Sequence, residues 1–208
     1  MSVELILGER LSLPEVSRTA LLRYLRAGDA TEALASLMEE CIREAEDCLD
    51  PRVCFRYFPI RVNGNSLDLG FATVESASLS RHLAGCEEIV LLAVTLGLGI
   101  DRLVARYSRV SPARALCLQA LGTERVECLC DLACSYFETE RFAGFETQSR
   151  FSPGYGDLSL SLQTEIIRAL DCPRQIGLSL RESLLMTPTK SVTAIVGLRK
   201  KEKENERF

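Results

Sequence analysis

The chain has 208 residues, of which 47% are hydrophobic, and this length and composition fit one globular domain with a buried core. Its formal net charge of −4 argues against a nucleic-acid-binding role, because affinity for the phosphate backbone needs a concentrated excess of lysine and arginine. The longest apolar run, 89–100, is too short to span a bilayer, so we expect no membrane association.

The two ends of the chain give two further expectations. The residues after Met1 lack the basic start and long hydrophobic region of a secretory signal, which favours a cytoplasmic protein. The basic residues between Arg199 and Arg207 are interleaved with glutamates, which predicts a solvated, disordered tail over 199–208. Residues 1–198 are then the expected single domain.

Nine cysteines raise the possibility of a metal site. No pair has the C-x-x-C spacing, although Cys130 and Cys134 share a helix face and could bind a metal together. We expect no metal site, because free cysteine usually behaves as a small buried hydrophobic residue. The only histidine, His82, is expected on a helix surface.

The N-terminal half predicts helices followed by strands. Residues 15–26 are typical of a helix, and Asp29 with Glu32 forms a capping box that starts a second, amphipathic helix ending near Cys48. The run 53–60 is strand-like. The remaining predictions are a hairpin turn at 63–65 into a strand at 66–71, a short helix at 79–83, a buried strand at 89–95 and a helix at 99–107.

The longest predicted helix begins at Ser111 and Pro112 and runs to about residue 138. Apolar residues surround it almost completely, which is typical of a helix at the centre of a fold. A rotation of 100° per residue places Glu124, Glu127 and Asp131 on one of its sides. This acidic stripe is either a structural ion-pair network or the wall of a pocket.

The segment R-F-S-P-G-Y-G at 150–156 predicts a sharp turn. Pro153 presets φ for the first corner, and Gly154 can take the positive φ that the second corner of a type II turn requires. Arg150 and Tyr155 project from the shoulders of this turn, and an arginine there could bind a carboxylate or phosphate through its fork of donors. The alternative is an ordinary surface turn with a solvated arginine.

The C-terminal part predicts a helix at 160–170 and strands at 176–180 and 192–196. Helices and strands are mixed, with few strict β-α-β alternations, which favours an α+β fold. No strand is followed by G-x-G-x-x-G, so a Rossmann cofactor site has no support.

Three sequence blocks carry a family resemblance: R-F-S-P-G-Y-G-D-L, then I-G-L-S-L-R-E-S-L-L-M-T-P, then K-S-V-T-A-I-V-G-L. In this order they resemble the activation domain of cobalamin-dependent methionine synthase, in its short, free-standing form. A weaker similarity, which includes V-T-L-G at 94–97 and A-L-G-T-E-R-V-E at 120–127, extends over most of the chain. The resemblance implies an activation-domain fold, with a twisted, mixed or antiparallel sheet packed with helices.

The resemblance also implies a binding site for S-adenosylmethionine. Arg150 matches the arginine that holds the methionine carboxylate, and Glu127 matches a glutamate on the long helix. Backbone groups around Ser152 and Gly154 would line the ligand, and Tyr155 matches the tyrosine between S-adenosylmethionine and the cobalt. Tyr155 and Glu127 are thus the implied catalytic residues. An acidic residue that contacts the ligand's amino group aligns loosely with Glu15.

The implied function is reactivation of a cobalamin-dependent methionine synthase, or a related corrinoid protein, as a methyltransferase-class subunit acting in trans. The partner carries the cobalamin, a flavodoxin-like donor reduces its Co(II) to Co(I), and Co(I) takes the methyl group of S-adenosylmethionine. Arg181 replaces the usual threonine of the T-E-S block, while Glu182 and Ser183 remain. The family's longer form also continues past the last strand with ligand-contacting tyrosines, where this chain has a charged tail.

Two alternatives stay open, and these two departures motivate the first. One is a module that docks onto a corrinoid protein without productive S-adenosylmethionine binding. The other is an ordinary S-adenosylmethionine methyltransferase with a small-molecule acceptor, although the glycine-rich strand-to-helix turn expected of that class is absent.

Overall fold

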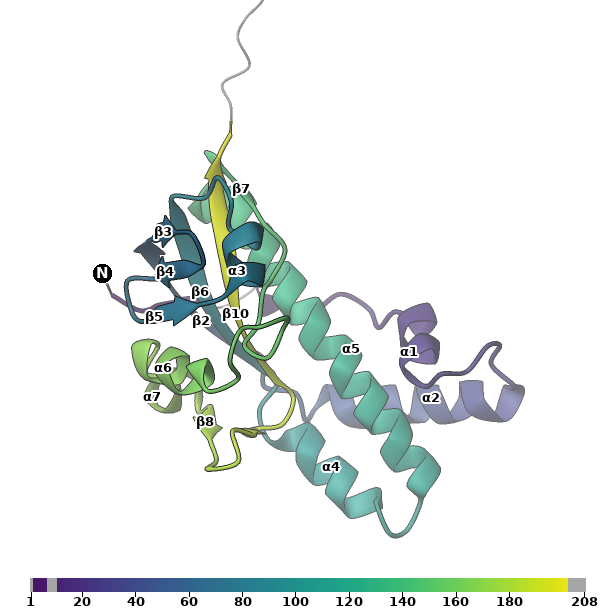
Figure 1. Ribbon diagram of the computed structural model, residues 1–208. Coiled ribbons are helices and arrows are strands. Elements are labelled where there is room, and N and C mark those ends of the chain that lie inside the picture. The colour runs from purple at the N-terminus through teal and green to yellow at the C-terminus, as the bar shows by residue number, and fades with distance from the viewer. Residues whose placement is uncertain (1, 7–10, 202–208) are drawn as a thin grey trace, which may run out of the picture.

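The computed structural model describes residues 2–6 and 11–201. Its centre is an antiparallel five-stranded sheet in the order β1-β2-β6-β10-β7 (Figure 1). The strands of this sheet are β1 (Glu4–Ile6), β2 (Arg52–Pro59), β6 (Glu88–Thr95), β10 (Ser191–Lys200) and β7 (Phe145–Thr147). None of the helices among the described residues is long and apolar enough to cross a membrane.

The middle strand β6 explains why the sheet is covered on both faces. Side chains alternate between the two faces of a strand, yet Ile89 to Thr95 are all buried. Ile89, Leu91 and Ala93 join one core, and Val90, Leu92 and Val94 join another. An apolar run of this kind is typical of a strand with packed layers on both sides.

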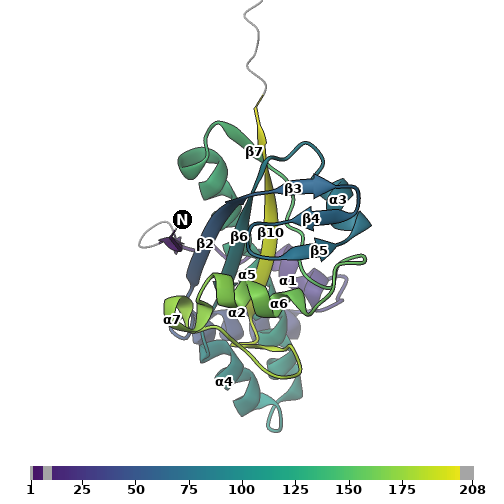
Figure 2. The same cartoon turned by 60° about the vertical axis from the view of Figure 1, so that its left-hand side comes forward.

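The first face is covered by short helices and a small second sheet. The helices are α3 (Ala77–His82), α6 (Leu162–Ala169) and α7 (Cys172–Ile176), and the small sheet consists of β3 (Arg61–Asn63), β4 (Ser66–Asp68) and β5 (Thr73–Glu75). Figure 2 shows α6 in front of the lower part of β6 and β10, with the small sheet and α3 to their right. A two-stranded hairpin of β8 (Ser179–Leu180) and β9 (Met186–Thr187) follows α7.

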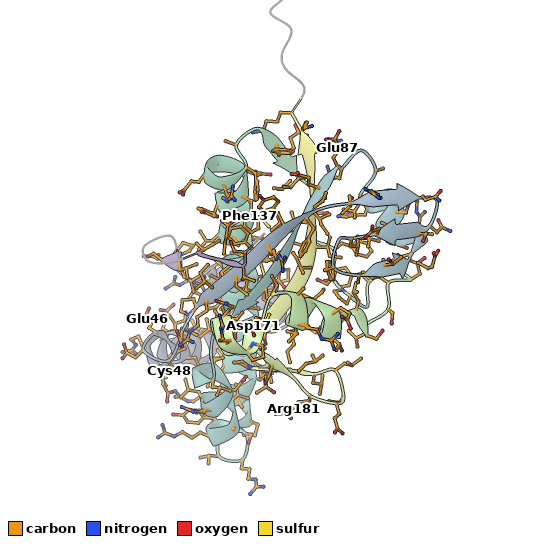
Figure 3. All side chains as sticks on the ribbon, turned by 90° about the vertical axis from the view of Figure 1, so that its left-hand side faces the viewer. Glu46, Cys48, Glu87, Phe137, Asp171 and Arg181 are labelled. Carbon is orange, nitrogen blue, oxygen red and sulfur yellow. The ribbon has the colours of Figure 1, made fainter. Side chains whose placement is uncertain are left out.

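The second face is covered by α5 (Pro112–Tyr136), which continues into a π-helical turn, η2 (Phe137–Arg141). Leu129, Ala133 and Phe137 pack there against the sheet, and Figure 3 labels Phe137. At 25 residues, α5 is about 37 Å long and extends well beyond the sheet.

The protruding half of α5 organises a helical lobe. Leu118 and Leu121 of α5 pack there against α1 (Arg18–Tyr24), α2 (Glu32–Glu46) and α4 (Gly99–Tyr107) in a third core. Figure 1 shows α4 and α5 as a helical hairpin away from the sheet, with α1 and α2 beside it. Because both cores contact α5, this helix is apolar on most of its sides, as its sequence predicts.

Most predicted elements are confirmed. The helix at 99–107, the hairpin turn at Gly64 and the buried strand at 89–95 lie where the sequence places them. The prediction for 66–71 is too long, because β4 ends at Asp68 and a separate strand, β5, begins at Thr73. The short strand β7 is missing from the prediction.

Two local predictions are wrong. Thr31, not Asp29, caps α2, because its hydroxyl accepts the N–H of Leu34. The predicted strand at 176–180 begins instead with the end of α7, where Gly177 takes a φ of +71° and stops the helix.

The last strand is longer than predicted. β10 includes Arg199 and Lys200, which pair with Glu146 and Phe145 of β7 and form ion pairs with Glu146 and Glu87, respectively. Structure therefore extends two residues into the segment expected as a tail. The rest of that prediction, 202–208, lies outside the described residues.

Candidate functional site

The predicted turn at 152–155 is confirmed. The N–H of Tyr155 donates to the carbonyl of Ser152 over 3.1 Å, and Gly154 has a φ of +90°. Pro153 at the first corner and a positive φ at the second are the features of a type II turn. A residue with a Cβ would be strained at the position of Gly154.

Three attachments hold this turn on the sheet and on α3. Phe151 forms a bridge with Ile195 of β10, with two backbone hydrogen bonds of 2.8 and 2.9 Å. His82 of α3 contacts the carbonyl of Ser149 through Nε2 at 2.6 Å. The third attachment is Asp157, whose carboxylate accepts the backbone N–H of Ala77 at 2.8 Å.

Contacts with the start of α3 also fix Gly156 and Asp157, the two residues that follow Tyr155. The Asp157 carboxylate accepts hydrogen bonds from the Ser76 hydroxyl and from the N–H of Ser78, and these bonds, with that of Ala77, hold the pKa of Asp157 far below its usual value. Gly156 lies against Ser78, where an added Cβ would stand 2.6 Å from the hydroxyl oxygen. The turn is therefore fixed before any ligand arrives.

Arg150 points from the start of this turn onto α5. Its Nη2 donates to Oε2 of Glu127 over 2.8 Å and to Oδ1 of Asp131 over 3.1 Å. Its Nη1 is buried and has no hydrogen-bond partner among the described residues. Arg150, Glu127 and Asp131, which we call the Arg150 cluster, thus hold one cation between two acids.

The acids of this cluster differ in exposure. The Glu127 side chain is 41% exposed and that of Asp131 is 75% exposed, whereas Arg150 is 21% exposed. Asp131 is therefore the more exposed of the two acids that bind Nη2 of Arg150. Packing around Asp131 and then the nearby charge of Glu127 raise the pKa of its carboxyl.

Tyr155 lies on the surface at the end of the turn. Its side chain is 58% exposed, and its ring contacts Phe151 edge-on with the centroids 5.9 Å apart. Ser152 lies between Phe151 and Tyr155 in the sequence. Its N–H forms no hydrogen bond among the described residues. Arg150, Ser152, Gly154 and Tyr155 thus belong to one fixed turn segment, and Glu127 contacts this segment through Arg150.

The third acid of the predicted stripe has a different environment. Glu124 is buried and forms an ion pair with Arg125, with 2.7 Å between Oε1 and Nη2. It also accepts the N–H of Ser17 over 3.0 Å, while Arg125 donates to the carbonyls of Pro14 and Glu15. This part of the stripe is a structural network that fastens the N-terminal segment to α5.

Glu15 lies outside the Arg150 cluster. It lines an apolar hollow of about 350 Å³, whose other walls include Leu13, Ile42 and Leu121. Its backbone carbonyl accepts a hydrogen bond from Arg125, which places Glu15 beside the Glu124–Arg125 pair.

A larger cavity than this hollow, of about 670 Å³, lies between the end of α2, α4 and α7. Its walls include Cys48, labelled in Figure 3, and three arginines. Arg52 is bound by both oxygens of Asp50, and Arg106 lies 3.8 Å from Glu44. Acids already compensate much of this positive charge, so the cavity does not stand out as an anion site.

The cysteines are free, and five of the nine are buried. Within residues 2–6 and 11–201, no group of three histidine, cysteine or acidic side chains is arranged to hold a metal ion. Burial raises the pKa of Cys134 to about 12, which makes its thiol a poor metal ligand.

No protein-family model matches the chain, and no curated protein sequence matches it. Among solved structures, it is similar to one described as the MetH reactivation domain bound to AdoHcy, with a TM-score of 0.72. The two share 15% sequence identity, over 98% of this chain and 80% of that chain. This chain has the fold of the MetH reactivation domain. The predicted α+β fold with an antiparallel sheet and packed helices is thereby confirmed.

Asp131 and Asp157 make contacts that could not be predicted from the sequence. Asp131 was placed on the acidic stripe, but its bond to Arg150 depends on a segment 19 residues away in sequence. Asp157 follows the turn motif directly, yet only the fold brings the start of α3 to it. A carboxylate one helical turn after Glu127 is the only sequence signal that could have indicated Asp131.

Proposed function

We propose that the protein binds S-adenosylmethionine and reactivates a cobalamin-dependent methionine synthase that carries the cobalamin. The observation that carries this proposal is the Arg150 cluster, whose arginine starts a fixed turn that also carries an exposed tyrosine, in a fold whose solved neighbour is described as bound to AdoHcy. The sequence blocks around Arg150 and Ser191 give the same assignment.

The charges of the Arg150 cluster suit this ligand. One arginine and two carboxylates give the cluster a net charge of −1, and S-adenosylmethionine carries one carboxylate, one ammonium and one sulfonium. Arg150 would bind the carboxylate, for which a guanidinium fork is well suited.

The neighbouring residues would position the rest of the molecule. Glu127 holds the guanidinium from the α5 side and fixes its orientation. Backbone groups around Ser152 and Gly154 would line the ligand. The N–H of Ser152 has no partner among the described residues, whereas that of Gly154 already donates to the carbonyl of Leu158 over 2.9 Å. The exposed ring of Tyr155 would face the partner's cobalt.

In this proposal S-adenosylmethionine supplies the methyl group and the partner's cobalamin supplies the metal that accepts it. The protein's own contribution is orientation, because a bound methyl donor held in line with its acceptor reacts far faster than one that diffuses freely. The protein would thus act in trans as a methyltransferase-class subunit, with a flavodoxin-like protein as electron donor.

Calorimetry tests the binding step. We expect the purified protein to bind S-adenosylmethionine, and Arg150→Ala to weaken binding by at least about tenfold, because a charge-assisted pair is lost. Arg168→Ala is the matched control, because Arg168 is an exposed arginine paired with Glu165 on α6. Equal affinities of the parent and Arg150→Ala would overturn the assignment.

The result also separates the alternative functions. Binding to a corrinoid protein without any binding of S-adenosylmethionine would favour the docking module. Methylation of a small acceptor in the absence of a cobalamin protein would favour an ordinary methyltransferase.

A further inference from the structure

The strand β5 forms one edge of the small sheet, and among the described residues no strand pairs with its outer side. Backbone hydrogen bonds at both ends of its ladder with β4 fix the orientation of the strand. The N–H of Leu69 donates to the carbonyl of Ala72 over 2.9 Å, and that of Ser76 donates to Asn65 over 2.8 Å. Because bonded and non-bonded pairs alternate along an antiparallel ladder, the backbone groups of Val74 point toward β4.

The same alternation turns the backbone groups of Thr73 and Glu75 away from β4. Within residues 2–6 and 11–201, none of these outward N–H and C=O groups has a hydrogen-bond partner. The edge of β5 therefore presents two donors and two acceptors, in the spacing that another extended segment could pair with.

A groove of about 560 Å³ runs along this edge. Residues 72–75 form one wall, and residues between Asp157 and Glu165, which include the start of α6, form the other. Figures 1 and 2 both show β5 next to α6. A strand added to β5 would lie about 4.8 Å from it, and thus in this groove. Because α6 forms a second wall, the groove suits a single extended segment better than the sheet of a second copy.

The side chains of the groove select the sequence of such a segment. Thr73 and Glu75 are exposed and share one face of β5, whereas Val74 points to the other face and packs against a buried core. Leu158 and Leu162, which are buried, also line the groove. An added strand would therefore place an apolar residue beside Val74 and polar residues on either side of it.

The charge of the groove selects the polar residues. Its lining includes three acids, Glu75, Asp157 and Glu165, and no lysine or arginine. Glu165 is paired with Arg168. Asp157 bonds to N–H and hydroxyl groups and so keeps its charge, and Glu75 forms no ion pair in the described part of the chain. Two uncompensated negative charges favour lysine or arginine in the segment.

We propose that this groove binds an extended segment of a partner protein, with alternating basic and apolar residues, as an added strand on β5. The backbone of Thr73 and Glu75 supplies the hydrogen bonds, and the side chains of Glu75 and Val74 supply the selectivity. This binding is independent of S-adenosylmethionine and of the Arg150 cluster.

Two synthetic peptides test the charge and the pattern. Fluorescence anisotropy measures the affinity of the labelled peptides K-V-K-V-K and E-V-E-V-E, with both ends blocked. We expect the parent protein to bind K-V-K-V-K at least about tenfold more tightly than E-V-E-V-E. Glu75→Lys, an exposed substitution that leaves the backbone unchanged, should remove or reverse this preference.

Two proline variants test the backbone pairing. Thr73→Pro removes an outward N–H and keeps the ladder with β4, so it should weaken binding of K-V-K-V-K at least about fivefold. Val62→Pro is the matched control. Val62 lies opposite Leu67, whose backbone bonds to β5, so its N–H points outward at the other edge of the same sheet. It should change the affinity less than about twofold, and circular dichroism checks that both variants fold. If Thr73→Pro does not fold, Glu75→Lys decides.

Each other outcome overturns the proposal. A parent protein that binds neither peptide, or binds both equally, shows no groove of this selectivity. A folded Thr73→Pro that binds like the parent places the peptide elsewhere. Self-association of the parent in sedimentation experiments that Thr73→Pro abolishes assigns the edge to a second copy of the chain.

Discussion

Two glutamates three residues apart on α5 should differ in how much stability the same substitution costs. The Glu124 and Arg125 side chains are 6% and 5% exposed, and Glu124 also accepts the N–H of Ser17. Glu124→Gln leaves the Arg125 charge buried without a counter-charge, which costs about 3 to 5 kcal/mol of unfolding free energy. Glu127 is 41% exposed, and its partner Arg150 keeps Asp131, so Glu127→Gln should cost less than about 1 kcal/mol.

Thermal unfolding followed by circular dichroism measures this difference. In a chain of this length, each kcal/mol shifts Tm by about 2 to 4 °C, so we expect Glu124→Gln to lower Tm by about 6 to 20 °C and Glu127→Gln by less than about 4 °C. The affinity for S-adenosylmethionine should show the reverse order. Similar Tm values for the two variants would refute the division of the acidic stripe into a structural part and a binding part.

Three further predictions concern the turn and its anchors. Gly156→Ala should lower the unfolding free energy measured in urea by about 1 to 3 kcal/mol, because φ is +54° and the new Cβ would meet Ser78. Gly144→Ala is the control, because Gly144 has open space around it, and this substitution should change the unfolding free energy little. The pKa of Asp157 is lower in the folded than in the unfolded state, so its contribution to stability is present above the unfolded pKa and is lost as pH falls. The parent should therefore lose more unfolding free energy than Asp157→Asn between about pH 5 and pH 3. Parallel pH profiles of the two proteins would contradict this. Tyr155→Ala should leave Tm unchanged within about 2 °C, because the side chain is 58% exposed, yet impair reactivation of the partner.

The sequence predicts the elements whose signal is local. The buried strand at 89–95, the helix at 99–107 and the long helix after Pro112 follow from apolar patterns and end signals within each segment. The turn at 152–155 is likewise predictable, because Pro153 and Gly154 restrict the backbone directly.

The failures arise where distant segments decide. The strand β7 has three residues and exists because β10 offers an edge for it. Asp29 was a plausible helix cap, but Thr31 stands next to the first helical residue and its hydroxyl reaches the N–H of Leu34. Periodicity placed Glu124, Glu127 and Asp131 on one stripe correctly, but only the fold shows that the first meets Arg125 and the other two meet Arg150.

The most direct test of the central claim uses a cobalamin-bound methionine synthase that lacks its own activation domain. This protein, S-adenosylmethionine and a low-potential reductant are added to the enzyme in its inactive Co(II) form, and the absorbance spectrum of the cobalamin is followed. We predict the return of the methylcobalamin spectrum with the parent protein, and its absence with Arg150→Ala. An unchanged Co(II) spectrum with the parent protein, under conditions in which an intact methionine synthase is reactivated, would contradict the account.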